Sequence, residues 1–227
     1  MLQSSLGKVD VVLSALEKSR PAVVAHCCRV STFAVRLAMQ YELDRDTIET
    51  VRLGALLHDV GKMLISSRIL DKPGRPNDRE WQELRVHSQL GMDIAHRAGF
   101  DDDVCGIILY HHERFDGKGY PDGLAGRATP FTARIVSVMD AFDALTSSRD
   151  YRERLNVDRA RQSIARDAGT RFCPWVVSGL LALPAAMLSP PDGRVPAVEW
   201  EERAGPWMSP LEALVEPWRG LDGAAAN

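Results

Sequence analysis

Apolar residues recur at steps of three and four along most of this chain, the spacing that places side chains on one face of an α-helix. The pattern is clearest in residues 8–18, 22–40 and 46–58, whereas the period-two alternation of strands is scarce. It predicts an all-α fold.

Two further helices have recognisable beginnings. Asn77 is followed three residues later by Glu80, the spacing of a capping box in which each side chain bonds the other residue's backbone N–H. This box predicts a helix over 79–97, with Gly99 marking its end. Another helix is expected over 102–113, because acidic residues in its first turn suit the positive end of the helix dipole.

The second half of the chain is expected to continue as helices. Thr129 and Pro130 have the residue types of an N-cap and a first helical position. Up to that point, residues 115–129 are rich in glycine and proline and predict a structured loop. The side chains that the following helix should bury are Ile135, Val138, Met139 and Phe142. The last helices are expected over 156–168, opened by Asn156, and over 174–183, opened by Pro174.

The composition changes after Leu188, where a stretch rich in Pro, Trp, Glu and Ala begins. We therefore divide the chain into an N-terminal helix (1–19), a main domain (20–188) and a C-terminal tail (189–227). Two interpretations of the tail stay open. It is either a short helix that packs back through its tryptophans or a flexible appendage.

Charge, hydropathy and cysteine usage narrow the classes of function. The formal net charge is −3, so no general basic surface is available to hold a nucleic-acid polymer. The longest apolar stretch, 176–188, is too short to span a bilayer, and the first twenty residues lack the pattern of a signal peptide. The four cysteines form no CxxC pair, which is typical of reduced thiols. We expect a soluble, cytoplasmic protein without a membrane span.

Five of the six histidines, namely His26, His58, His87, His111 and His112, fall at or beside predicted helix positions, and they are accompanied by the acids Asp59 and Asp140. This is the residue usage of a metal site. His58 and Asp59 follow an apolar stripe, where a charged pair would be costly to bury without ions. His111 and His112 are adjacent at an apolar helix end, which packing alone does not explain. Asp59 is the natural bridge between two divalent ions, because each of its oxygens can face one of them.

Other members of this set are ambiguous when taken singly. His26 or His87 alone is as well explained as an ordinary core or surface histidine, and His96 is interpreted in that way. The adjacent Cys27 and Cys28 are interpreted as packing residues of a helix.

The motifs resemble those of the HD superfamily and of its HD-GYP branch. Residues 58–62, HDVGK, are similar to the HDxGK signature, and residues 111–121, HHERFDGKGYP, are similar to the longer and more specific HHExxDGxGYP signature. Further matches, in family order, are His26-Cys27-Cys28-Arg29-Val30 to HxxRV, residues 72–74 to KPG, His87 with Gly91 to HxxxG, and residues 140–147 to DxFDALTS.

The resemblance implies an all-helical bundle with a five-helix HD core and additional HD-GYP helices. It also implies hydrolysis of the cyclic dinucleotide c-di-GMP to pGpG or GMP by a hydroxide that bridges two metal ions. The implied metal ligands are His26, His58, Asp59, His87, His111, His112 and Asp140. The implied catalytic residues are Asp59 and Lys62, and the implied substrate contacts are Lys62, Gly119, Tyr120, Pro121, Arg149 and Arg152.

The implied cofactors are two divalent ions, best satisfied by iron or manganese. Nickel, cobalt and zinc are also compatible, because mixed imidazole and carboxylate ligands do not select sharply among metals. The expected partner is the cyclic dinucleotide itself. Control is expected through a homodimer or a signalling protein partner.

Three departures from the family pattern change these expectations. Some family members place a glutamate that holds a third metal where this chain has Ala22, so we expect two metals, with His26 as the least secure ligand. Asp150 replaces a proline between Arg149 and Arg152, which puts a carboxylate beside the implied phosphate clamp. Residues 168–174 resemble the family's GGTxFDP with alanine and cysteine substituted, which affects helix capping more than chemistry.

Two alternatives stand beside the c-di-GMP phosphodiesterase. One is a non-catalytic sensor or interaction module that retains its metals. The other is an enzyme of the same kind with a different substrate, such as cyclic GMP-AMP or a nucleotide monophosphate ester. Retention of all seven implied ligands and of Lys62 favours an active enzyme.

Overall fold

The protein is a bundle of helices. The computed structural model describes residues 2–147 and 154–188 of the 227-residue chain. Its α-helices are α1 (Leu2–Ser19), α2 (Pro21–Gln40), α3 (Arg45–Leu57), α4 (Ser67–Leu70), α5 (Asp78–Arg85), α6 (His87–Arg97), α7 (Asp102–Tyr110), α8 (Phe131–Thr146), α9 (Val157–Arg166) and α10 (Pro174–Ala182). Short 3-10 helices are η1 (Val60–Leu64), η2 (Gly126–Ala128) and η3 (Ala185–Leu188). The described residues contain no strand, which confirms the all-α prediction.

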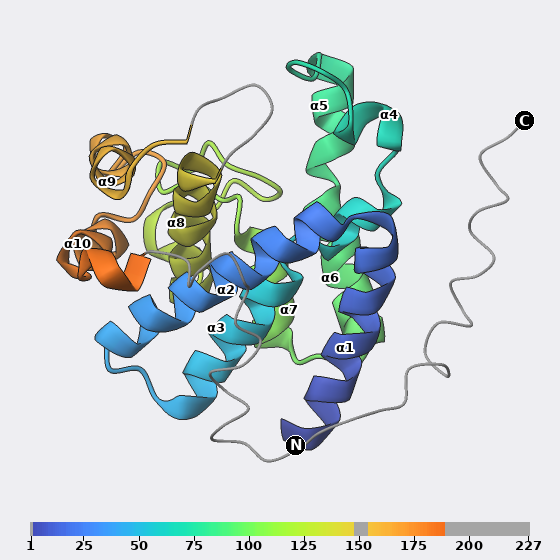
Figure 1. Ribbon diagram of the computed structural model, residues 1–227, viewed down its shortest axis with the longest axis horizontal. Helices are drawn as coiled ribbons and strands as arrows, with labels where there is room; N and C mark the ends of the chain where they lie inside the picture. Colours follow the sequence, from blue (N-terminus) through green and yellow to red (C-terminus); the bar gives the residue numbers. More distant parts are fainter. Residues whose placement is uncertain (1, 148–153, 189–227) are drawn as a thin grey trace, which may run out of the picture.

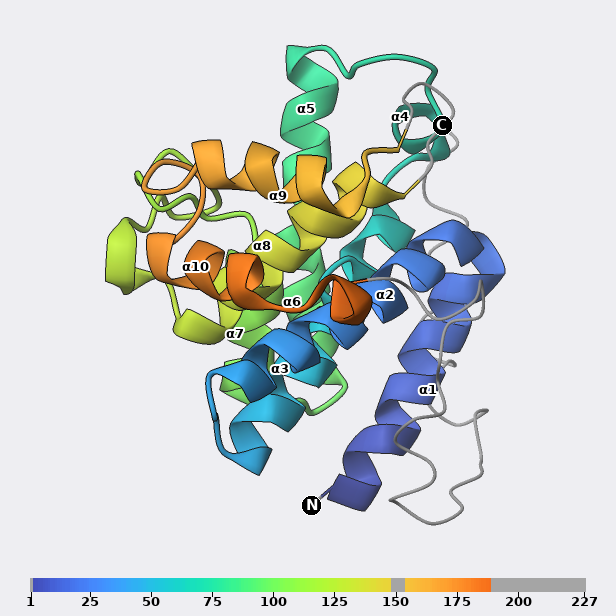
Figure 2. The ribbon, with the colours of Figure 1, turned by 60° about the vertical axis from the view of Figure 1, so that its left-hand side comes forward.

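The interior consists of two apolar cores that share helices α3 and α7. In Figure 1, helix α2 runs across the middle of the molecule, with α8, α9 and α10 on one side and α1 and α6 on the other; Figure 2 also shows α1 apart from α9 and α10. The first core lies among α2, α3, α8, α9 and α10, where the rings of Phe33 and Phe142 meet edge to face at 5.5 Å. The second lies among α1, α3, α6 and α7. Because α3 contributes Ala55 to one core and Leu57 to the other, the end of this helix lies at their junction.

Helix α2 is also the one described helix that is long and apolar enough to cross a membrane by length and composition. Its inward side chains, including Phe33 and Leu37, are buried in the first core.

The structure confirms two of the predicted helix beginnings. The Asn77 side chain accepts a hydrogen bond from the backbone N–H of Glu80 at 2.9 Å, and the Glu80 carboxylate accepts one from the backbone N–H of Asn77 at 2.8 Å, completing the capping box. Asn156 accepts from the backbone N–H of Arg159 at 2.9 Å and caps α9.

The prediction of one continuous helix over 79–97 is wrong at Val86, which separates α5 from α6. At this break the His87 ring turns back, and its Nδ1 lies 2.7 Å from the Leu84 carbonyl oxygen. Helix α5 consequently stands away from the rest of the bundle (Figure 1).

Two other predicted boundaries are also wrong. Helix α7 ends at Tyr110, three residues before the predicted end, because the chain turns there into the loop that follows. Thr129 does not cap α8, since Pro130 occupies the N-cap position and the Thr129 hydroxyl donates instead to the Leu124 carbonyl at 3.4 Å.

A contact between two glycines lets η1 lie directly against α6. A Cβ atom at Gly61 would overlap the carbonyl oxygen of His87 and lie 2.6 Å from the backbone nitrogen of Gly91. A Cβ at Gly91 would lie 3.2 Å from the Gly61 nitrogen and 3.0 Å from a methyl group of Ile108. The glycines of the HDxGK and HxxxG motifs therefore serve one purpose, which is the close approach of two backbones.

Replacement of Gly61 by alanine tests this packing. The added methyl group must displace backbone atoms, so we expect Gly61→Ala to lower the free energy of unfolding by about 3 kcal/mol. Urea unfolding would measure the change. Gly106 in α7 is the matched control, because a Cβ there would have nothing within 4 Å, and alanine at this position should stabilise the helix by up to about 1 kcal/mol. Equal effects of the two substitutions would contradict this account.

Candidate metal centre

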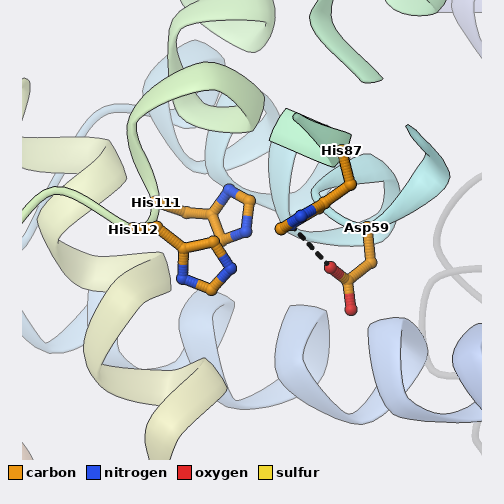
Figure 3. A group of neighbouring side chains, drawn as sticks. All are labelled: Asp59, His87, His111 and His112. Atoms are coloured by element: carbon orange, nitrogen blue, oxygen red, sulfur yellow. Dashed lines mark ion pairs between the residues drawn. The ribbon is translucent and has the colours of Figure 1, made fainter. Parts of the chain in front are cut away.

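The fold brings the seven histidines and aspartates implied as ligands into two adjoining groups. They come from α2, the end of α3, the start of α6, the end of α7, and α8. The first group is Asp59, His87, His111 and His112, and the second is His26, His58 and Asp140; within each group the potential ligand atoms lie within 4.8 Å of one another. Figure 3 shows the first group, in which the imidazole rings and the Asp59 carboxylate point toward a common centre.

Three of these histidines are held in the same way by the chain that precedes them. The Nδ1 atoms of His58, His87 and His111 lie 2.7, 2.7 and 2.8 Å from the carbonyl oxygens of the residues three positions earlier. A carbonyl oxygen can only accept, so Nδ1 carries the hydrogen and Nε2 presents a lone pair. All three Nε2 atoms are buried and have no hydrogen-bond partner.

The Asp59 carboxylate lies between the two groups. Its Oδ1 is 3.4 Å from Nε2 of His87, and its Oδ2 is 3.5 Å from Nε2 of His58 and 3.8 Å from Nε2 of His26. Oδ2 also accepts a 2.5 Å hydrogen bond from Nζ of Lys62, while Oδ1 is buried without a partner. Each oxygen of this carboxylate thus faces a different group of histidines.

Burial sets the protonation states of the site. It lowers the pKa values of His58, His87 and His111, and it lowers that of His112 to about 3. Although burial alone would favour the neutral acid, Lys62 and the surrounding histidines hold the pKa of Asp59 well below its usual range. Neutral imidazoles and an ionised carboxylate are the forms that bind divalent metal ions. The unpartnered Nε2 atoms and Asp59 Oδ1 therefore fit such ions.

His26 is held differently from the other three histidines. Its Nδ1 lies 2.7 Å from a carboxylate oxygen of Asp143, and its Nε2 lies 3.1 Å from Asp140. Asp143 is buried and also accepts two hydrogen bonds from the Arg29 guanidinium, at 2.7 and 2.9 Å. Although burial disfavours the imidazolium, the hydrogen bonds to Asp140 and Asp143 raise the pKa of His26 to about 9.

Sequence reasoning assigned no role to Asp143 or to Arg29. Both lie within the family motifs, since Arg29 is the arginine of HxxRV and Asp143 is the second aspartate of DxFDALTS. A carboxylate that accepts from the far side of a ligand histidine fixes the orientation of that ring. Their positions in these two motifs were the one feature of the sequence that could have indicated a role for them.

Glu113 is a third residue whose role the sequence did not show. It is buried, and its carboxylate accepts hydrogen bonds from three successive backbone N–H groups, those of Asp122 at 2.7 Å, Gly123 at 2.9 Å and Leu124 at 3.1 Å. The residue that follows His112 thereby holds the loop that contains Tyr120 and Pro121. Gly119 is needed in the same loop, because a Cβ there would overlap the backbone of Arg114.

The implied substrate residues fall in three places. The Tyr120 ring lies over His112, with 4.8 Å between ring centroids, and Pro121 follows it on the exposed side of the loop. Lys62 is bonded to Asp59 rather than free. Arg149 and Arg152, with Asp150 between them, lie outside the described residues.

Two residues that were interpreted as ordinary surface or packing residues lie as follows. His96 is exposed on α6, and Cys27 is fully buried beside His58 and Asp59.

The family model of the HD domain matches residues 10–176 of this chain. The chain belongs to the HD domain family. Within it, the sequence HHERFDGKGYP is that of the HD-GYP branch, in agreement with the relatives that follow. HD phosphohydrolases are metal-dependent, which agrees with the histidine and aspartate groups described above.

Several curated proteins are similar to this HD-GYP domain. The cyclic di-GMP phosphodiesterase response regulator RpfG of Xanthomonas campestris is 39% identical over 155 residues, which cover 67% of this chain and 41% of that protein. The 3'3'-cGAMP-specific phosphodiesterase 2 of Vibrio cholerae is 34% identical over 170 residues, covering 74% of this chain and 33% of that protein. The chain thus spans less than half the length of either relative.

Solved structures agree on the fold. A cyclic GMP-AMP specific phosphodiesterase of V. cholerae superposes with a TM-score of 0.63 and 21% identity, covering 88% of this chain and 52% of that one. The HD domain of the phosphodiesterase PgpH of L. monocytogenes, in complex with cyclic-di-AMP, superposes with a TM-score of 0.56 and 16% identity, covering 78% of this chain and 94% of that one.

The opposed pKa shifts predict how the stability of the metal-free HD-GYP domain depends on pH. His112, with its pKa lowered from 6.5 to about 3, binds a proton more readily in the unfolded chain, so stability is lost as the pH falls below 6.5. His26, with its pKa raised to about 9, contributes stability below 6.5 that is lost as the pH rises through 9. We expect a maximum near pH 6.5 in urea midpoints measured between pH 4 and 9.5.

His26→Gln supplies the control for the alkaline side. This variant removes the raised pKa but leaves His112 in place, so the decline above pH 6.5 should become shallower while the acid side keeps its slope. A wild-type profile that is flat from pH 5 to 9 would disagree with these protonation states.

Proposed function

We propose that this chain is a metal-dependent phosphodiesterase that hydrolyses the cyclic dinucleotide c-di-GMP to pGpG or GMP. The observation that supports it most is a set of three buried Nε2 atoms without partners, those of His58, His87 and His111. They lie around the Asp59 carboxylate, whose two oxygens face different histidines. Nitrogen lone pairs and carboxylate oxygens of this kind are costly to bury unless a cation satisfies them. The relatives named as cyclic di-GMP phosphodiesterases support the substrate class.

The two groups of side chains would each hold one divalent ion, with Asp59 shared between them. His87, His111 and His112 would complete one site, and His26, His58 and Asp140 the other. We expect two ions rather than three, because Ala22 offers no ligand atom. Iron or manganese suits these ligands, and nickel, cobalt or zinc is also compatible. When bound, the ions would neutralise the phosphodiester and lower the pKa of a water nucleophile.

The chain's own residues would position and stabilise the substrate. Lys62 donates one hydrogen bond to Asp59, and an ammonium group has three donors, so two remain for the oxygens of a phosphate. Glu113 fixes the loop that carries Tyr120 beside the metal centre. The implied clamp by Arg149 and Arg152 remains part of the proposal.

The proposed location is the cytoplasm. The four cysteines Cys27, Cys28, Cys105 and Cys173 are free, as expected for an enzyme of the reducing cytoplasm.

A second substrate has support of its own. Relatives of V. cholerae at 34% and 32% identity are named as 3'3'-cGAMP-specific phosphodiesterases. The two cyclic dinucleotides differ only in one base, guanine or adenine, so the same metal centre serves either. Parallel assays with c-di-GMP and cyclic GMP-AMP separate these candidates.

The decisive experiment is anaerobic purification with metal analysis, followed by incubation with c-di-GMP and detection of pGpG and GMP. The double variant His58→Ala, Asp59→Ala should lose bound metal, and its kcat/KM should fall by about a thousandfold or more. His96→Ala is the matched control, because this histidine is exposed on α6. Unchanged metal content in the double variant would refute the ligand assignment. A metal-loaded wild type that binds c-di-GMP without hydrolysing it would favour the sensor module.

Replacement of Asp143 tests the second group of ligands separately. Asp143→Asn removes the charge that faces Nδ1 of His26 but keeps the shape of the side chain. We expect the affinity for one ion to fall by about 10- to 100-fold, so that dialysed protein holds close to one ion per chain. Metal analysis after dialysis measures this. Asp93→Asn is the control, because this aspartate is exposed on α6. Two ions retained in both variants would argue against this role of Asp143.

A further inference from the structure

A row of planar side chains leads outward from the metal centre to the surface. The His112 ring lies 4.8 Å from the Tyr120 ring, and the guanidinium carbon of Arg85 lies 5.1 Å from the Tyr120 centroid. The same guanidinium lies 5.7 Å from the ring of Trp81, of which 41% is exposed. His112, Tyr120, Arg85 and Trp81 therefore form a continuous series of flat groups between the metal centre and the surface.

Arg85 differs from the other basic side chains described around this site. Lys62 is bonded to Asp59, Arg29 to Asp143, and Arg114 to Asp116. Within residues 2–147 and 154–188, Arg85 has no carboxylate partner. Its guanidinium is held by the faces of two aromatic rings, which leaves the N–H donors at its edges available to an anion.

The break at Val86 gives Arg85 this position. Trp81 and Arg85 are four residues apart and so lie on one face of α5, and the chain turns immediately afterwards into the ligand histidine His87. Helix α5 stands out from the bundle (Figures 1 and 2), and none of its residues belongs to either apolar core. Its side chains are thus free to contact a molecule that extends beyond the metal centre.

We propose that Trp81, Arg85 and Tyr120 bind the half of the cyclic dinucleotide that is not being hydrolysed. Arg85 takes the second phosphate through its paired N–H donors, and the exposed Trp81 ring stacks on a purine base. A guanidinium matches the geometry of phosphate oxygens, and an aromatic ring stacks on a base of any sequence. This inference rests on the proposed function, because it names the second contact of the same substrate.

Steady-state kinetics of Arg85→Ala test the assignment. Loss of a contact that is made equally in the ground state and the transition state raises KM and leaves kcat unchanged. We expect KM for c-di-GMP to rise about tenfold, with kcat within about twofold of wild type. Arg85→Lys keeps the charge but loses the planar fork, so its KM should lie between the two.

Two controls separate substrate binding from structural damage. Arg79→Ala removes an arginine from the same helix, one that pairs with Glu83 at 3.3 Å and has a 90% exposed side chain, and it should leave KM unchanged. Bis(p-nitrophenyl) phosphate is a phosphodiester that lacks a second nucleotide. Arg85→Ala should hydrolyse it as wild type does, and its metal content should also match wild type.

The outcomes distinguish this inference from the proposed function. Unchanged KM for c-di-GMP in Arg85→Ala, or equal losses on both substrates, would overturn the role of Arg85 and leave the phosphodiesterase standing. A metal-loaded wild type that hydrolyses neither substrate would overturn the proposed function. In that case the Kd for c-di-GMP tests the inference. A Kd that is roughly tenfold weaker in Arg85→Ala supports binding by Trp81, Arg85 and Tyr120. An equal Kd in the two proteins, or no binding by the wild type, refutes it.

Discussion

The structure depends on the burial of one ionised carboxylate, that of Asp59. A charge removed from water at the junction of two apolar cores is strongly unfavourable unless opposite charge and hydrogen-bond donors surround it. Lys62 supplies part of that compensation to one oxygen, while the other oxygen faces Nε2 of His87 without a donor. Three of the helices around it, α3, α6 and α7, end or begin at a histidine that faces this centre, whereas α2 and α8 run past it. A divalent cation is the group that would satisfy what the protein leaves open.

Two different arrangements position the candidate ligand histidines, and helix ends provide the first. His58, His87 and His111 each use the carbonyl of the residue three positions earlier to fix the ring, so the backbone itself sets which nitrogen is free. His26 lies in the interior of α2, where such carbonyls are already engaged by the helix, and a side-chain pair of Asp143 and Arg29 performs the same task. The Asp143 carboxylate that holds His26 is charged, whereas the backbone carbonyls that hold the other three histidines are neutral.

The sequence predicted the all-α fold, the two capping residues Asn77 and Asn156, and a set of ligand candidates that the fold brings together. It could not show the break at Val86, because η1 packs against the start of α6 through Gly61, a contact between segments that are distant in the sequence. The prediction that Thr129 caps α8 was wrong, because its hydroxyl donates to the Leu124 carbonyl instead of bonding the N-terminus of the helix. Roles for Glu113 and Asp143 required knowing which distant groups they meet.

The hydrogen bonds of Glu113 have a consequence for how this loop can vary. Among the described residues, the hydrogen bonds that this carboxylate accepts come from the backbone N–H groups of residues 122–124, and these groups are present whatever the side chains are. Gly123, at φ +70°, is the one of the three whose residue type the backbone conformation restricts. The side chains at positions 122 and 124 can therefore vary while the backbone bonds to Glu113, and with them the shape of the loop beside His112, are retained.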